Sequence, residues 1–165
     1  MALYMKYGTL DGEVTETGHE GWLAIDSASF GVGRSTNVEV GSGQEKRHRD
    51  QPTISDIQIS RTYDKSSPLL FNEAVVGKPQ KVQIDFLEPA DNPDAAPNVY
   101  LSLIMRNCLL SSYSVGGGAG GCTESVAINF TAINIQYTAY DKEDQPSPTK
   151  GFFDLVTAKA VWWSA

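Results

Sequence analysis

Cysteine and histidine are scarce in this sequence, which has 2 Cys and 2 His among 165 residues. Cys108 and Cys122 flank a glycine-rich turn. In a simple hairpin centred there they would lie about five residues out of register, or roughly 16 Å apart at about 3.3 Å per residue. A disulfide needs Cα atoms within about 7 Å. The sequence therefore predicts two reduced, partly buried thiols. Because no C-x-x-C or H-x-x-x-H pair occurs, no metal site is expected either.

Long apolar runs and a basic leader are also missing. No stretch approaches the roughly 18 apolar residues of a membrane-spanning helix, so no membrane insertion is expected. The first seven residues lack the basic and apolar regions of a cleavable signal peptide. We therefore expect a protein that is made in the cytoplasm and that, if it is secreted, leaves by a route that reads no such signal.

Positive charge is in deficit, with 13 Lys and Arg against 20 Asp and Glu and a formal net charge of −7. This balance argues against a general affinity for nucleic acid or anionic lipid, and we expect no nucleic-acid partner. The hydrophobic share of 41% and the charged share of 20% are ordinary for a soluble globular protein. The length suits a single domain, which we expect to span residues 1–165.

Recognisable catalytic motifs are absent as well. Residues 116–121 formally contain G-x-G-x-x-G, but an alternating strand pattern follows them where a dinucleotide site needs a helix. His19 and His48 have no Cys, Ser or carboxylate at a familiar catalytic spacing, and no carboxylate pair stands out. We expect no catalytic residues, cofactor or metal. A β-barrel small-ligand carrier, or an enzyme without a recognisable motif, stays open as an alternative.

What the sequence does contain is β periodicity along most of its length. Apolar residues alternate with polar ones over 57–63, 82–86, 99–115 and 123–138, and further strands are expected at about 2–9, 22–33 and 151–162. The apolar parity reverses near Thr131–Ala132. A passage of the chain from one sheet to another would cause this reversal, as at the corner of a barrel.

One segment, about residues 67–76, has the pattern of a helix. Ser67 is the expected N-cap, Pro68 suits the first helical position, and Gly77 is expected in the left-handed conformation that ends many helices. The expected core-facing stripe consists of Leu70, Phe71, Ala74 and Val75. The predicted fold is mainly β: a compact β-barrel of two sheets with one short α-helix on one side or plugging one end.

Polar loops separate these elements. Residues 34–52 form a long polar stretch that carries the basic run Lys46, Arg47, His48 and Arg49, while residues 88–98 and 141–150 are acidic, proline-bearing loops. The basic run can be a solvated loop, a weak nucleic-acid patch, or a contact with an acidic surface of another copy. A loop of this length in a small domain usually has a function or is disordered.

Five blocks in this order resemble the haemolysin-coregulated protein family, the tube protein of the type VI secretion system. The most specific is Asp64-Lys65-Ser66-Ser67-Pro68-Leu69-Leu70, which resembles the family's helix-opening D-x-S-S-P-x-L and contributes Asp64, Ser66, Ser67 and Pro68. The others are Asp11–Glu13 with Thr17–Ile25, Ser27–Val32, Thr123–Phe130 and Gly151–Leu155.

The resemblance implies a structural tube subunit without catalytic residues. It implies hexameric rings that stack into the inner tube, a lumen that can hold or chaperone small effector proteins, and export together with the spike through a sheathed machine. It also implies that the loop 34–52 reaches a neighbouring subunit or ring. We therefore expect Lys46, Arg47, His48 and Arg49 to lie in a ring-stacking loop, and the protein to be cytoplasmic before firing and secreted afterwards.

Overall fold

The computed structural model describes residues 1–38, 47–49, 51–90, 96–141 and 145–160. Within these residues the chain is mainly β with one α-helix, α1 (Ser67–Val76). The strands are, in chain order, β1 (Ala2–Tyr7), β2 (Leu23–Ala24), β3 (Ser27–Ser29), β4 (Val32–Gly33), β5 (Thr36–Val38), β6 (Arg47–Arg49), β7 (Thr53–Ile54), β8 (Ile57–Thr62), β9 (Gln80–Glu88), β10 (Asn98–Gly118), β11 (Gly121–Asn129), β12 (Ala132–Tyr140) and β13 (Pro146–Asp154).

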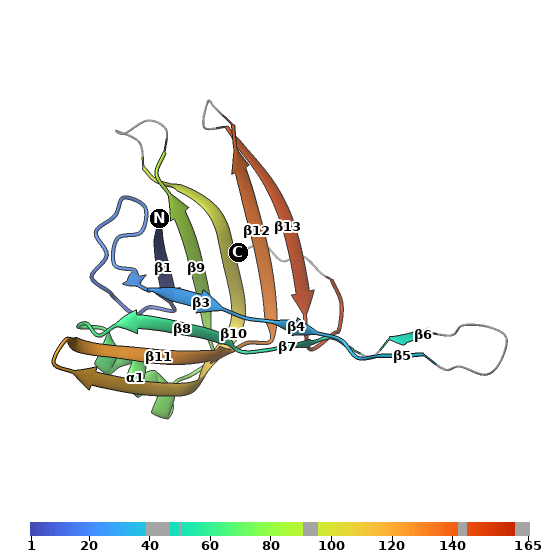
Figure 1. Ribbon diagram of the computed structural model, residues 1–165, viewed down its shortest axis with the longest axis horizontal. Helices are drawn as coiled ribbons and strands as arrows, with labels where there is room; N and C mark the ends of the chain where they lie inside the picture. The colour runs from blue at the N-terminus through green and yellow to red at the C-terminus, as the bar shows by residue number, and fades with distance from the viewer. Residues whose placement is uncertain (39–46, 50, 91–95, 142–144, 161–165) are drawn as a thin grey trace.

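Two antiparallel sheets share the long strand β10. Its first half pairs with β9 and β12, and its second half pairs with β11 through the glycine-rich hairpin. The first sheet runs β2-β1-β9-β10-β12-β13, and the second runs from β10 through β11 and β8 to β3. Figure 1 shows the strands of the first sheet rising steeply from those of the second, so the two sheets enclose the core between them.

Two of the chain crossings between the sheets meet at one corner. Asn107, where β10 leaves the first sheet, has a φ of 51°, a left-handed conformation that Asn tolerates better than most residues. Its side-chain amide donates to Thr131 Oγ1 at 3.0 Å, and the Thr131 amide donates to the Arg106 carbonyl at 3.1 Å. Thr131 lies between β11 and β12, so the parity reversal predicted near Thr131–Ala132 is confirmed as a passage between sheets.

The expected strand at 22–33 is three short strands instead, because this segment changes partner repeatedly. β2 pairs with β1, β3 with β8, and β4 with β7. Between them the Ile25 amide donates to the Leu3 carbonyl and the Asp26 amide to the Ser60 carbonyl. In the described residues each strand from β2 through β1, β9, β10, β11 and β8 to β3 pairs with the next, but β2 and β3 do not pair with each other. Residues 25 and 26 connect these two strands along the chain.

The core between the sheets is built from the alternating faces that the sequence predicted. Its fully covered members include the apolar residues Met5, Leu23, Ile57, Leu70, Val82, Ile84, Met105, Val126 and Ile128. Cys108 is buried here, and burial raises the pKa of its thiol to about 12. Cys122 is exposed on the β10–β11 hairpin, so both thiols are free as predicted but only one of them is covered.

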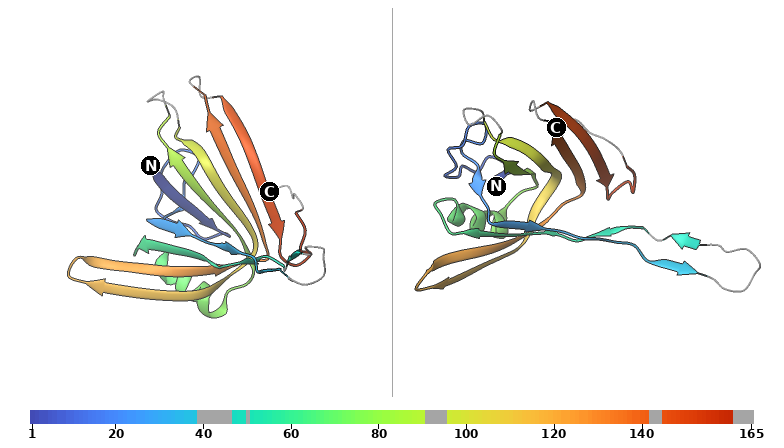
Figure 2. Two further views of the ribbon diagram at one scale, coloured as in Figure 1. Left: turned by 45° about the vertical axis from the view of Figure 1, so that its right-hand side comes forward. Right: turned by 45° about the horizontal axis from the view of Figure 1, so that its top comes forward.

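Helix α1 has the predicted bounds, but its ends and its faces differ from the prediction. Ser66 is the N-cap and Ser67 the first helical residue, and Gly77 is extended with φ −62° because the chain leads directly toward β9. Leu70 is fully buried, whereas Phe71 and Val75 are 53% and 64% exposed. The helix packs against β10 at one end of the space between the sheets (Figure 2), so only one edge of the expected apolar stripe faces the core.

The last expected strand, 151–162, is displaced toward the N-terminus. β13 begins at Pro146, inside the expected loop 141–150, and ends at Asp154. Two prolines are compatible with this strand because it lies at the edge of its sheet. A turn follows, in which the Asp154 carboxylate accepts from the amides of Val156 and Thr157. No helix in the described part of the chain is long and apolar enough to cross a membrane.

Candidate functional site

The most prominent surface feature is a two-stranded arm. β4 and β7 pair with each other, and beyond them β5 pairs with β6 in the register Thr36↔Arg49, Asn37↔His48 and Val38↔Arg47. Figure 1 and Figure 2 show these strands extending away from the two sheets. The described parts of the expected loop 34–52 are thus a hairpin arm, whose pairing the polar sequence did not predict.

The predicted ring-stacking residues fall on this arm as far as the structure describes them. Arg47, His48 and Arg49 form β6, and Lys46 lies outside the described residues. Within the described residues β5 and β6 pair only with each other, so the arm presents this basic strand without support from the two sheets.

The helix-opening motif surrounds a buried ion pair. Arg61 on β8 and Glu124 on β11 are each 1% exposed, and Arg61 Nη1 donates to Glu124 Oε1 at 2.8 Å. Ser67 Oγ donates to the same oxygen at 2.9 Å, and Tyr113 Oη donates to Glu124 Oε2 at 2.6 Å. Burial, together with the Glu124 carboxylate, raises the pKa of Tyr113 and keeps its phenol protonated as a donor. The buried carboxylate is therefore satisfied from three elements.

Arg61 uses its remaining donors to fix the start of the helix. Its Nε donates to the Ala24 carbonyl at 3.1 Å, Nη1 also donates to Ser66 Oγ at 2.9 Å, and Nη2 lies 2.5 Å from Asp64 Oδ2. The Asp64 carboxylate in turn accepts from the Ser66 amide at 2.8 Å. Burial alone would raise the pKa of Asp64, but the hydrogen bonds from Ser66 and the Arg61 charge outweigh it and hold this pKa below its usual value.

These contacts give the motif a structural role. Ser67 is buried and bonds to Glu124, and Pro68 occupies a helical position where the missing amide costs no hydrogen bond. Every polar side chain of Asp64, Ser66 and Ser67 is directed into the network that joins β2, β8, β11 and α1. The motif holds four segments together, and of its polar groups only Asp64 also borders an open cavity.

A second buried polar cluster involves His19, for which the sequence indicated only polar surroundings. His19 is 6% exposed, and its Nε2 lies 3.0 Å from Oδ2 of Asp85 on β9. Asp85 also accepts from Ser102 Oγ at 2.5 Å. The rings of Tyr4 and Trp22 flank His19 at centroid distances of 5.5 and 4.5 Å. The cluster fastens the segment before β2 to the first sheet, and its carboxylate partner is remote in sequence.

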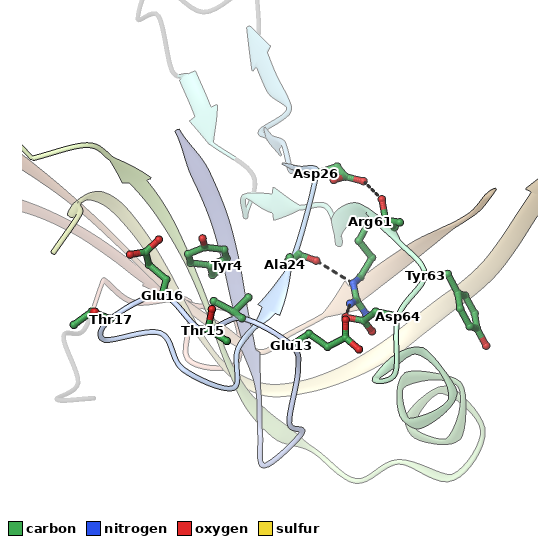
Figure 3. Close-up of a pocket in the computed structure, with 12 residues that line it drawn as sticks. Tyr4, Glu13, Thr15, Glu16, Thr17, Ala24, Asp26, Arg61, Tyr63 and Asp64 are labelled. Atoms are coloured by element: carbon green, nitrogen blue, oxygen red, sulfur yellow. Dashed lines mark hydrogen bonds and ion pairs between the residues drawn. The ribbon is translucent and has the colours of Figure 1, made fainter. Parts of the chain in front are cut away.

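A large cavity beside the buried ion pair is open and acidic. It has a volume of ≈ 640 Å³ and lies beside Arg61, between the segment before β2 and the end of β8. Figure 3 shows Glu13, Asp26 and Asp64 around the Arg61 side chain, with Glu16 farther along beside Tyr4. Because Arg61 is already paired with Glu124 and Asp64, the carboxylates of Glu13, Glu16 and Asp26 make this opening attractive to a positively charged group.

Comparisons with known proteins agree with this architecture. The family described as "Type VI secretion system effector, Hcp" matches residues 4–137. A solved structure titled "Structure of a type six secretion system protein" is 20% identical, with 96% of this chain and 98% of that chain covered and a TM-score of 0.79. Hcp1 from Salmonella typhimurium is 18% identical over 97% of this chain and 98% of its own, with a TM-score of 0.77. A search of curated proteins finds no match.

The solved structures show the fold, and the family match covers more than half of the chain. The fold and the family match together define a protein of the type VI secretion system that acts as a structural component. The chain belongs to the Hcp family: it is a secreted tube subunit and effector carrier and not an enzyme. The resemblance read from the sequence is confirmed.

Proposed function

We propose that this chain forms hexameric rings that stack into the inner tube of a type VI secretion machine, with the basic arm joining one ring to the next. The family match supports the tube role, and the projecting arm β5–β6 is the observation that carries the stacking role. In this proposal the single unit 1–165 lines a lumen for small effectors. It is cytoplasmic before firing and leaves with the spike through the sheath, without a cleavable signal peptide.

The charge distribution supports a contact between unlike surfaces. The arm carries Arg47 and Arg49 on β6, whereas the open cavity carries Glu13, Glu16 and Asp26. A surface that meets a different surface of the next copy forms a heterologous contact, which generates rings or stacks. A contact between charges at the surface is salt-sensitive and readily released, which suits a tube that is built and then shed.

The test is charge reversal on the arm. In Lys46→Glu/Arg47→Glu/Arg49→Glu, we expect rings of about 107 kDa, six times the 17.9 kDa chain, in native mass spectrometry. Negative-stain images should then show few or no tubes. A matched variant, Lys65→Glu/Lys78→Glu/Lys81→Glu, makes the same charge change at exposed residues of the body and should still form tubes.

The acidic partner surface can be tested by compensation. Adding Glu13→Lys/Glu16→Lys to the arm variant should restore part of the tube formation, because the two surfaces then again carry opposite charge. Tubes that form equally well after arm reversal would contradict the stacking role. A protein that stays monomeric at micromolar concentration would contradict the ring itself.

A further inference from the structure

Helix α1 is apolar on its outward side as well as on the side that faces the core. Its only charged residue, Glu73, turns toward the body: the Oε2 atom is buried, and burial together with this carboxylate raises the pKa of Tyr7 on β1. Among the exposed residues of the helix only Asn72 is polar. The others, which we call the outer helix face, are Pro68, Leu69, Phe71, Val75 and Val76. A helix that is apolar all round is normally buried on all sides.

The outer helix face is fixed in place before any partner arrives. The Phe71 ring is half exposed, yet it packs edge-on against the ring of Tyr113 on β10 at a centroid distance of 5.9 Å. Tyr113 is itself fixed by its hydrogen bond to the buried Glu124. A surface that is already ordered loses little conformational freedom when it is covered. A contiguous, ordered and exposed apolar surface is typical of a protein–protein contact.

A second apolar surface is a groove at the base of the arm. It has a volume of ≈ 260 Å³, and no charged side chain of the described residues lines it. One wall comes from the strands at the base of the arm and the other from β12 and β13. The main lining residues are Phe30, Val32, Ile54, Ile133, Ile135 and Phe153. Val32 is 62% exposed, so the groove is open to solvent.

These two apolar surfaces lie at different ends of the molecule. Figure 1 shows α1 below the left part of the second sheet, whereas β4, β7, β12 and β13, which flank the groove, lie toward the right of the body. Because α1 packs against β10, it cannot cover the groove of its own chain. Each surface therefore needs a neighbouring molecule.

We propose that the outer helix face of one copy packs into the groove of the next copy around the ring. This inference rests on the proposed ring and names the surfaces that close it. Two different surfaces of one chain form a heterologous contact, which closes into a ring when the rotation between copies fits. Every copy then has both its helix and its groove covered. Two helices that paired with each other would leave both grooves open to solvent.

The chemistry of this contact differs from that of the stacking contact. Neither the outer helix face nor the groove presents a charge, so burial of apolar area stabilises it. A helix of ten residues is about 15 Å long, which makes this contact the centre of a ring interface whose polar rim lies around it. Salt therefore has little effect on the ring, whereas it weakens the contact between the arm and the acidic surface.

The test uses two variants that each damage one surface. The helix variant is Val75→Lys/Val76→Lys, and the groove variant is Val32→Asp. Lysine is favourable in the last turn of a helix, so α1 itself should persist. We expect each variant alone to lose the six-chain ring in native mass spectrometry, because a charge buried in an apolar contact without a partner is unfavourable.

Mixing the two variants shows whether the surfaces are partners. The groove of the helix variant and the helix of the groove variant are both intact, so one contact can still form. We expect dimers of about 36 kDa, twice the 17.9 kDa chain, with one copy of each variant and no larger rings. These dimers would also show that both variants are folded.

Other outcomes of this experiment overturn the proposal. Rings in either variant alone would show that the contact is not needed. Dimers of the groove variant alone would show that helices pair with each other, and a mixture without dimers would show that the two surfaces are not partners. The matched control is Val156→Lys/Thr157→Lys, because Val156 and Val76 are each 76% exposed. This control should keep its rings.

The parent protein separates this contact from the proposed function. A parent that stays monomeric would contradict the hexamer and this contact together, whereas rings shared by the parent and both variants would contradict only this contact. At about 1 M NaCl, where the Debye length is about 3 Å, tubes of the parent should separate into intact rings. Rings that dissociate along with the tubes would overturn an apolar contact between helix and groove.

Discussion

The two polar regions of this chain are organised in opposite ways. Around Arg61, polar side chains from β8, β11 and the start of α1 are buried and satisfy one another. In the arm, β6 carries its basic residues on a hairpin that, in the described residues, pairs only with itself. The difference leads us to expect that charge in the body governs folding, whereas charge in the arm matters for the proposed contact with other subunits.

Removing the buried carboxylate should produce the largest loss of stability. Glu124→Ala leaves the Arg61 guanidinium, which is 1% exposed, without its main counter-charge. Breaking one partner of a buried pair typically costs about 3–5 kcal/mol, because an uncompensated charge stays buried. We expect the free energy of unfolding in urea to fall by about that amount at constant protein concentration, since assembly also stabilises the folded chain.

The arm provides the control for this experiment. Arg47→Glu/Arg49→Glu changes more charge than Glu124→Ala does. In the described residues, however, the strand that carries it pairs only within the arm, and substitutions away from buried contacts usually alter stability by less than about 0.5 kcal/mol. Glu124→Ala should therefore lower the free energy of unfolding, whereas Arg47→Glu/Arg49→Glu should reduce tube formation and leave that free energy nearly unchanged. A Glu124→Ala protein that unfolds at the same urea concentration as the parent would remove the basis of the comparison.

Helix α1 repeats the same comparison within one element. Leu70 is fully buried in the core, while Val75 is 64% exposed. Leu70→Ala should lower the free energy of unfolding by about 2–5 kcal/mol, because it removes buried methyl groups and leaves a cavity. Val75→Ala should change it by less than about 0.5 kcal/mol. Similar urea midpoints for the two variants would mean that the helix does not face the core as described.

Local signals in the sequence were sufficient for one group of features. The bounds of α1 follow from Ser67 and Pro68 at its start, and the β10–β11 hairpin follows from glycines between alternating strands. Even so, the prediction of a left-handed conformation at Gly77 was wrong. Gly77 is extended, because the direction of the following strand determines its conformation. The stripe through Phe71 and Val75 was also wrong, since the helix touches the core along only one narrow edge.

The candidate site was predictable in part for the same reason. Its motif residues were found as a contiguous block, but their partner Glu124 lies 63 residues from Arg61, and Asp85 lies 66 residues from His19. A single sequence has no periodicity that pairs such distant charges. The strand pairing of the arm was missed because a polar hairpin shows no apolar alternation, and the stacking role of Lys46, Arg47, His48 and Arg49 stays a prediction.

The smallest expected effect is a pH dependence at the edge of the buried network. The Asp64 carboxyl has a lowered pKa in the folded state through its bonds to Ser66 and Arg61, even though burial opposes this shift. Because this pKa is lowered on folding, the stability that the Asp64 carboxylate contributes is fully present above its pKa in the unfolded chain. That contribution is lost as the pH falls through the pKa of Asp64 in the folded state. Asp64→Asn should therefore be slightly less stable at neutral pH and should lose less of its stability on acidification than the parent.

Urea unfolding from pH 7 down to the acid limit measures this difference. Asp141→Asn is the control, because Asp141 is exposed and asparagine keeps an oxygen that can accept from the Gln145 amide. We expect the curves of the parent and of Asp64→Asn to converge toward low pH and the curve of Asp141→Asn to follow the parent throughout. A constant offset between the parent and Asp64→Asn would show that the carboxylate acts through shape alone. In that case the charge of Asp64 would contribute as little to folding as we expect of the charges on the arm.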